Sequence, residues 1–133
     1  MACCQKLIDS EDFHAVVRKL RDFFEGRGFT EVHTQNRSTI ATYNYNGQVW
    51  PLPQTGQMWL EYELLKRPEA KGFFCLSTSY RDEPNPVEGR HDKIFPMFEF
   101  EIKGGLDELL QMEKDLLAHL GFGSADSFPE GDY

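Results

Sequence analysis

The chain has 133 residues, the usual length of one domain, so residues 1–133 are expected to form a single core. Its 14 Lys and Arg against 22 Asp and Glu give a net charge of −8, which repels phosphate backbones and excludes a general nucleic-acid coat protein. The 40% hydrophobic content, with 11 Phe, supplies a packed interior and is unlike that of a disordered sequence.

Targeting and redox signals are weak. The apolar runs are short and interrupted by charge, so the sequence predicts no membrane-spanning segment. The amino-terminal sequence MACCQKLIDSED does not have the basic start and apolar stretch of a secretory signal, and we therefore expect a cytoplasmic protein. Cys3, Cys4 and Cys75 include no Cys-x-x-Cys pair, which argues against a disulfide framework or a zinc knuckle, and Cys75 is predicted to fill core space.

The first part of the chain predicts a helix, a short strand and a hairpin. Apolar residues recur at helical spacing between Asp9 and Gly28, where Asp9 or Ser10 is suited to cap the start. Residues 29–34 are rich in β-branched and aromatic types and are predicted to form a strand. A β-hairpin is expected between Thr42 and Leu52, because Asn-Gly pairs favour the tight turns of hairpins.

The second part predicts two helices around a long pair of strands. Helices are expected over Gln57–Lys66 and Leu106–Leu120. Strands are expected over Phe73–Tyr80 and Ile94–Lys103. Together these elements predict an α+β fold, in which helices flank an antiparallel β-sheet.

The last predicted strand has two different faces. One face is apolar and belongs to the core: Ile94, Pro96, Phe98, Phe100 and Ile102. The other carries a ring, a thioether and charged groups: Phe95, Met97, Glu99, Glu101 and Lys103. In the partner strand, Ser77, Ser79 and Arg81 share one face, so the two strands are predicted to form the floor of a polar pocket. The alternative is that Glu99 and Glu101 form the solvent face of an edge strand.

The segment between these strands, residues 81–93, concentrates charges of both signs. A solvated loop with exposed ion pairs is one interpretation. A nucleotide site is the other, because the guanidinium of Arg81 is suited to bind a phosphate with two hydrogen bonds. Arg90 and His91 could reach a second phosphate, and the ring of Phe95 could lie under a purine base.

Three segments resemble motifs of a known protein family, and they follow one another along the chain in the order that the family has. SYRDEPNPVEGRHDKIFPMFEFE is similar to the second signature motif of class II aminoacyl-tRNA synthetases. LPQTGQ resembles the Gln-Ser-Pro-Gln segment of the aspartyl, asparaginyl and lysyl subgroup, and RKLRDFFEGRGFTEVHTQ resembles the first signature motif. The resemblance covers about residues 11–120 and fits best the aspartyl/asparaginyl branch and the related A-type asparagine synthetase.

This resemblance implies ATP-dependent formation of an acyl-adenylate, with ATP and a small amino acid as substrates. It implies that Arg81 contacts the α-phosphate and the amino-acid carboxylate, and that Glu83 accepts a hydrogen bond from the adenine amino group. Arg90 and His91 would hold the outer phosphates, and Phe95 would stack on adenine. Gln57 and Glu99 would bind the amino acid, and the carboxylate of Glu99 would pair with the ammonium group of that substrate. The alternatives without ligand binding are a core role for Phe95, a helix cap for Gln57 and an exposed loop position for His91.

The sequence also departs from the family pattern. The departures are Gln35 in the first motif, Leu60 after the Gln-Ser-Pro-Gln-like segment, and Ile94 and Met97 around the stacking phenylalanine. No Gly-x-Gly-x-Gly-x-Asp-Arg third motif occurs in these residues, so the family's ligands for Mg²⁺ are not in this chain and no metal-binding residue is predicted. Two interpretations stay open: part of a longer enzyme, or a shortened relative.

The leading hypothesis is amino-acid activation as part of an aspartyl/asparaginyl-tRNA synthetase-like or A-type asparagine synthetase-like ligase. The resemblance implies a homodimer, and tRNA would be bound only through regions not present here. The alternative is a non-catalytic synthetase paralogue that acts as a dimerisation or regulatory module.

Overall fold

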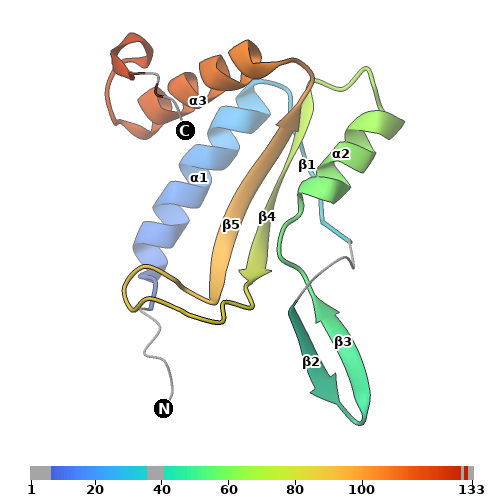
Figure 1. The fold of residues 1–133 in the computed structure, drawn as a ribbon. Helices are drawn as coiled ribbons and strands as arrows, with labels where there is room; N and C mark the ends of the chain where they lie inside the picture. Colours follow the sequence, from blue (N-terminus) through green and yellow to red (C-terminus); the bar gives the residue numbers. More distant parts are fainter. Residues whose placement is uncertain (1–6, 36–40, 130, 132–133) are drawn as a thin grey trace.

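The computed structural model describes residues 7–35, 41–129 and 131. The elements that fix the fold are α1 (Ser10–Gly26), β1 (Thr30–Glu31), β2 (Ala41–Tyr45), β3 (Gln48–Leu52), α2 (Gln57–Lys66), β4 (Gly72–Tyr80), β5 (Ile94–Ile102), α3 (Leu106–Leu120) and the short 3₁₀ turn η1 (Ala125–Ser127). Figure 1 shows α1 and α3 side by side near β5, α2 near β1, and the β2–β3 hairpin extending away from the sheet. The α+β fold class predicted from the sequence is confirmed.

Local chemistry explains where these elements begin and end. The carboxylate of Asp9 caps α1 by accepting hydrogen bonds from the backbone N–H groups of Glu11 and Asp12, at 2.9 and 3.0 Å. The hairpin turn places Asn46 and Gly47 at φ values of 50° and 73°, the left-handed pair that a tight type I′ hairpin turn requires. Gly121, at φ 98°, ends α3.

The sheet has the order β1-β4-β5. β4 and β5 are antiparallel, with Cα partners that include Cys75 with Glu99 and Ser79 with Phe95. β1 is shorter than the predicted strand over residues 29–34 and pairs with β4 in parallel, so within this sheet the expected antiparallel arrangement holds for β4 and β5 only. β2 and β3 form a separate antiparallel hairpin, as predicted. The parallel pairing follows from the chain path, because α2 and the hairpin lie between β1 and β4 and return the chain to the same direction.

The core occupies both faces of this sheet. On one face, Phe24 contacts the rings of five other phenylalanines at centroid distances of 4.9–5.5 Å, and Met112 and Leu116 of α3 pack against the same cluster. On the other face, Leu60 of α2 packs with Phe73 and Cys75. Cys75 is fully buried, as predicted, while Cys3 and Cys4 lie outside the described residues. Helices therefore cover both faces, and α2 covers only one end of the second.

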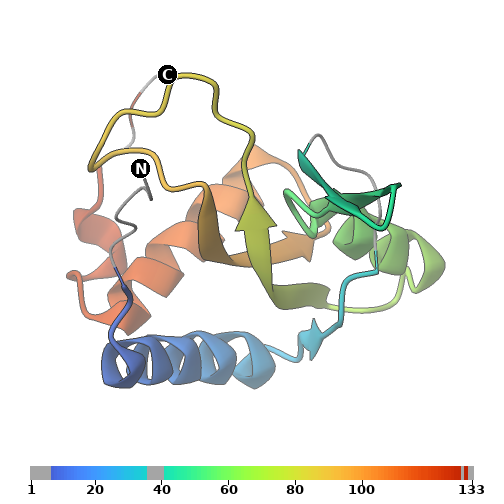
Figure 2. The ribbon, with the colours of Figure 1, turned by 90° about the horizontal axis from the view of Figure 1, so that it is seen from below.

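The uncovered part of that second face is where the β4–β5 loop begins. Figure 2 shows this loop, in yellow to gold, projecting from the ends of β4 and β5. Alternation along the strands puts Ser77, Ser79, Phe95, Met97 and Glu99 on the α2 side and leaves Phe98 and Phe100 in the core. The two-faced pattern predicted for β5 is present from Phe98 to Ile102. The core positions predicted for Ile94 and Pro96 are wrong, because both are exposed and only Phe98, Phe100 and Ile102 pack against the phenylalanine cluster.

Candidate functional site

The loop of residues 81–93 is held by its own backbone. The N–H of Arg81 donates to the carbonyl of Lys93 at 2.8 Å and extends the β4–β5 ladder by one pair. Farther along, the carbonyl of Val87 accepts hydrogen bonds from the N–H groups of Arg90 and His91, both at 3.0 Å. This turn brings Arg90 and His91 back toward the start of β5.

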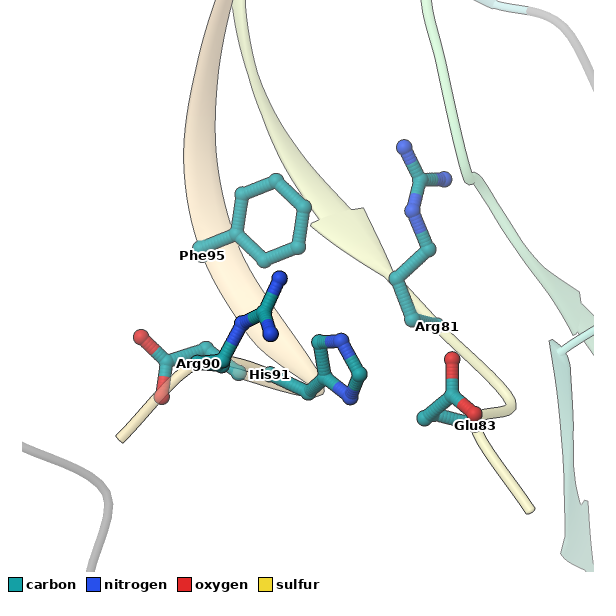
Figure 3. A pocket seen from close by; sticks show the side chains of 6 residues that line it. Arg81, Glu83, Arg90, His91 and Phe95 are labelled. Atoms are coloured by element: carbon teal, nitrogen blue, oxygen red, sulfur yellow. The ribbon is translucent and has the colours of Figure 1, made fainter. Parts of the chain in front are cut away.

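A cavity of about 470 Å³ opens at this place. Its lining residues are Arg81, Glu83, Arg90, His91, Asp92 and Phe95. Figure 3 shows Phe95 and Arg90 on one side, Arg81 and Glu83 on the other, and His91 between them. The structure thus brings together all five side chains for which the sequence predicts contacts with ATP. Their individual roles stay predictions, and Asp92 is a lining residue that the sequence analysis did not single out.

Arg81 is half-buried and has a fixed direction. Its Nη1 donates to the carbonyl oxygen of Gln54 at 2.7 Å, and its guanidinium carbon lies 5.5 Å from the centre of the Phe95 ring. The first contact consumes one of the five N–H donors, and the second is within the range of a cation–π interaction. The remaining N–H groups stay available to an anionic ligand in the cavity.

His91 is oriented by the loop that carries it. Its Nδ1 accepts a hydrogen bond from the backbone N–H of Val87 at 3.1 Å. An accepting Nδ1 places the proton of the neutral imidazole on Nε2, which makes Nε2 a donor. The ring is exposed, in keeping with its place on the rim of the cavity.

Glu99 lies on the same sheet face and is not a solvent-facing carboxylate of an edge strand. Its two oxygens accept hydrogen bonds from the hydroxyl of Thr55 and from the backbone N–H of Gly56, the latter at 2.7 Å. The side chain is half-buried. Burial and the nearby Glu99 raise the pKa of the Cys75 thiol to about 12, which makes this thiol inert.

Gln57 lines a different cavity from the five side chains predicted to contact ATP, and its role in binding the amino acid stays a prediction. It lies at the first position of α2 and is exposed, and the N-cap of this helix is Gly56, so Gln57 does not cap it. Its side chain faces Glu101, and both line a separate cavity of about 400 Å³. Burial, followed by the charge of Glu61, raises the pKa of Glu101, and the hydrogen bond from Gln57 opposes this shift. Gln57 is separated from the first cavity because the start of α2 lies over the end of β5 that is remote from the charged loop.

The segment LPQTGQ, which joins β3 to α2, was identified by its resemblance alone, and its contacts with Arg81 and Glu99 were not predicted. The carbonyl of Gln54, the hydroxyl of Thr55 and the N–H of Gly56 hold Arg81 and Glu99 in place. Two of these three groups belong to the backbone, and residue types do not predict the contacts of backbone groups. A side chain at Gly56 would come within 2.7 Å of both Cys75 Sγ and Thr34 Cγ2, so the glycine itself was the available signal.

The part of the chain that the structure describes holds no trio of His, Cys, Asp or Glu side chains placed to bind one metal ion. Within residues 7–35, 41–129 and 131, every helix is too short or too polar to serve as a bilayer span.

Comparison with known proteins gives one line of evidence from sequence and another from structure. No protein-family model matches the chain. An asparagine–tRNA ligase from Sorangium cellulosum is 31% identical over 97 residues, which cover 67% of this chain and 21% of that protein. The chain therefore spans about a fifth of the curated relative that it matches.

Solved structures agree with this result. Asparaginyl-tRNA synthetase from Pyrococcus horikoshii, complexed with asparaginyl-adenylate, matches with a TM-score of 0.67 at 20% identity, over 80% of this chain and 26% of that one. The corresponding Entamoeba histolytica complex has the same TM-score at 23% identity, over 80% and 25%. A putative aspartyl-tRNA synthetase from Leishmania major scores 0.65 at 19% identity, over 80% and 21%. These structural matches establish the fold, and together with the sequence match they show that the chain is an aspartyl/asparaginyl-tRNA synthetase-like class II core.

Proposed function

We propose that this chain contributes the ATP and amino-acid subsites for acyl-adenylate formation. The observation that carries the proposal is the cavity at the end of β4 and β5, where Arg81, Arg90 and His91 surround a space next to the ring of Phe95. Glu99 lies on the same sheet face and is held by the segment that also holds Arg81. Cations, an aromatic ring and a nearby carboxylate match the parts of ATP and of an amino acid.

In the proposed reaction, a carboxylate oxygen of the amino acid attacks the α-phosphorus of ATP. A new P–O bond forms, the bond to the bridging oxygen breaks, and pyrophosphate leaves with that oxygen. Arg81 stabilises the charge that develops on the α-phosphoryl oxygens, and a guanidinium fixed before the reaction does so without reorganisation. The protein supplies position and charge, and no side chain acts as nucleophile.

The other side chains take the roles that the family resemblance implies. Phe95 stacks on adenine, Glu83 accepts from its amino group, and Arg90 and His91 bind the outer phosphates. Oε2 of Glu99 accepts from the Gly56 N–H and, at longer distances, from the Ser77 hydroxyl and the Cys75 thiol, whereas Oε1 accepts from the Thr55 hydroxyl. An oxygen of a carboxylate has about two lone-pair positions, so Oε1 retains capacity for the substrate ammonium. Gln57 binds the amino acid in this proposal, from its position beside Glu101 in the neighbouring cavity.

Mg²⁺ enters no step of this proposal. The described residues do not fit a metal site, because no three ligating side chains converge among them. A homodimer, and the use of tRNA through regions outside this chain, are further proposals that extend the family resemblance. Two of the solved neighbours are described as bound to asparaginyl-adenylate, so asparagine and aspartate are the first amino acids to test.

Exchange of labelled pyrophosphate into ATP tests the proposal. The chain is assayed with asparagine and with aspartate, beside Arg81→Ala and the control Arg18→Ala, which removes an exposed arginine of α1. We expect Arg81→Ala to lower the exchange rate by roughly 100-fold or more, the usual loss for a group that stabilises transition-state charge, and Arg18→Ala to leave it unchanged.

Calorimetric titration with ATP separates the two candidate functions. Absence of both exchange and ATP binding, or equal exchange by Arg81→Ala, would refute amino-acid activation. ATP binding without exchange would instead support a non-catalytic, dimerisation or regulatory module.

A further inference from the structure

Ser79 is a buried polar group that the proposed reaction does not use. Its side chain has no solvent exposure, and it is the one polar residue in the buried core of the described residues. The hydroxyl donates to the carbonyl oxygen of Gln54 at 2.5 Å. A buried hydroxyl without a partner is costly, so this bond explains how Ser79 is tolerated, but it does not explain why the position is not apolar.

The same carbonyl oxygen also accepts from Arg81. Arg81 Nη1 lies 2.7 Å from it, so the hydroxyl and the guanidinium share one acceptor, which a carbonyl with two lone pairs allows. The surrounding backbone is anchored on both sides. The carbonyl of Pro53 accepts from the N–H of Tyr80 at 2.9 Å, and the N–H of Gly56 donates to Glu99 at 2.7 Å.

We propose that Ser79 is a positioning residue, which holds the Gln54 carbonyl where it fixes the guanidinium of Arg81. An arginine side chain has many rotamers, and ordering it at the moment of binding reduces affinity. Ser79 and Gln54 order it in advance, at 5.5 Å from the Phe95 ring. This inference rests on the proposed function of Arg81, but it assigns a role to a residue that never reaches the ligand.

A double-mutant cycle on ATP affinity tests the inference. The chain, Ser79→Ala, Arg81→Ala and the double variant are titrated with ATP by calorimetry. Ser79→Ala is expected to weaken ATP binding by up to roughly tenfold, the upper end of what one neutral hydrogen bond contributes. In the Arg81→Ala background the same substitution is expected to have no further effect, because Ser79 acts through Arg81. Thr78→Ala, at an exposed neighbour on the opposite sheet face, is the matched control and is expected to bind as the parent does.

Each outcome distinguishes this inference from the proposed function. If Arg81→Ala weakens ATP binding and Ser79→Ala does not, the positioning role is refuted and the proposed site stands. If Ser79→Ala costs the same factor with and without Arg81, the serine acts through general stability and the inference fails. Unchanged binding by Arg81→Ala would overturn the proposed site itself. If Ser79→Ala does not fold, the same cycle is run with Ser79→Cys, which has a similar volume and a weaker hydrogen-bond donor. We then expect an intermediate loss of ATP affinity, and binding equal to that of the parent chain would count against the inference.

Discussion

Glu99→Gln tests whether the carboxylate holds the segment before α2. An amide has nearly the same shape but no charge, and only one of its two ends accepts hydrogen bonds. The two short hydrogen bonds to Glu99 come from the Thr55 hydroxyl and the Gly56 N–H, and the Ser77 hydroxyl and the Cys75 thiol donate at 3.5 and 3.9 Å. In the variant, the amide oxygen keeps one donor, while the NH₂ group faces the other.

The size of the effect follows from these two contacts. A hydrogen bond to a charged group contributes about 1.5–3 kcal/mol and a neutral one about 0.5–1.5 kcal/mol. Two weakened bonds at a half-buried site therefore predict a loss of about 1–2 kcal/mol after solvent screening. For a chain of this length, 1 kcal/mol corresponds to roughly 4 °C, so the thermal midpoint should fall by about 4–8 °C.

Thermal denaturation followed by circular dichroism at pH 7 measures this change. Glu101→Gln is the matched control, on the same strand and face two residues away. It removes a carboxyl whose pKa is raised by burial and by Glu61, so its midpoint should stay equal or rise. Equal midpoints for Glu99→Gln and the parent chain, or equal losses in both variants, would show that Glu99 does not hold the segment.

Three further predictions follow from the core and from the shifted pKa values. Phe24→Ala should lower the free energy of unfolding in urea by about 3–5 kcal/mol because its buried ring contacts five others, and the exposed Phe13→Ala should change it far less. Since the pKa of Glu101 is raised in the folded state, the folded chain binds the proton more tightly than the unfolded chain. The free energy of unfolding should therefore fall as the pH rises from the ordinary pKa of 4.5 through the raised pKa. Glu101→Gln should remove that fall, and a variant whose pH profile runs parallel to that of the parent would contradict the prediction. Cys75, with a pKa of about 12, should resist iodoacetamide at pH 8 in the native chain and react in urea, as peptide mass mapping will report; rapid native labelling would refute its burial.

Sequence patterns anticipated much of the fold because their signals are local. The bounds of α2 and α3 agree with the predicted Gln57–Lys66 and Leu106–Leu120, since helical periodicity and the glycine at 121 act over a few residues. The Asn46-Gly47 turn likewise needs only its own two residues. Strand β1 was shorter than predicted, because its length depends on pairing with β4 and not on its own composition.

The candidate site divides in the same way. Alternation along β5 was enough to place Phe95 and Glu99 on one face, and the charged loop was enough to select Arg81, Arg90 and His91, which line one cavity. The sequence could not place Gln57, which faces Glu101, because the position of α2 over the sheet is set by the packing of Leu60 on Phe73 and Cys75.

The sequence by itself determined the elements, the two faces of β5 and the set of charged side chains, because each depends on spacing within one short segment. The tertiary structure alone decided that the Gln54 carbonyl meets both Ser79 and Arg81, and that Thr55 and Gly56 hold Glu99. Those contacts join residues 25 or more positions apart, and several use backbone atoms, whose presence no residue type signals. Their geometry follows from how the chain packs, which no local pattern encodes.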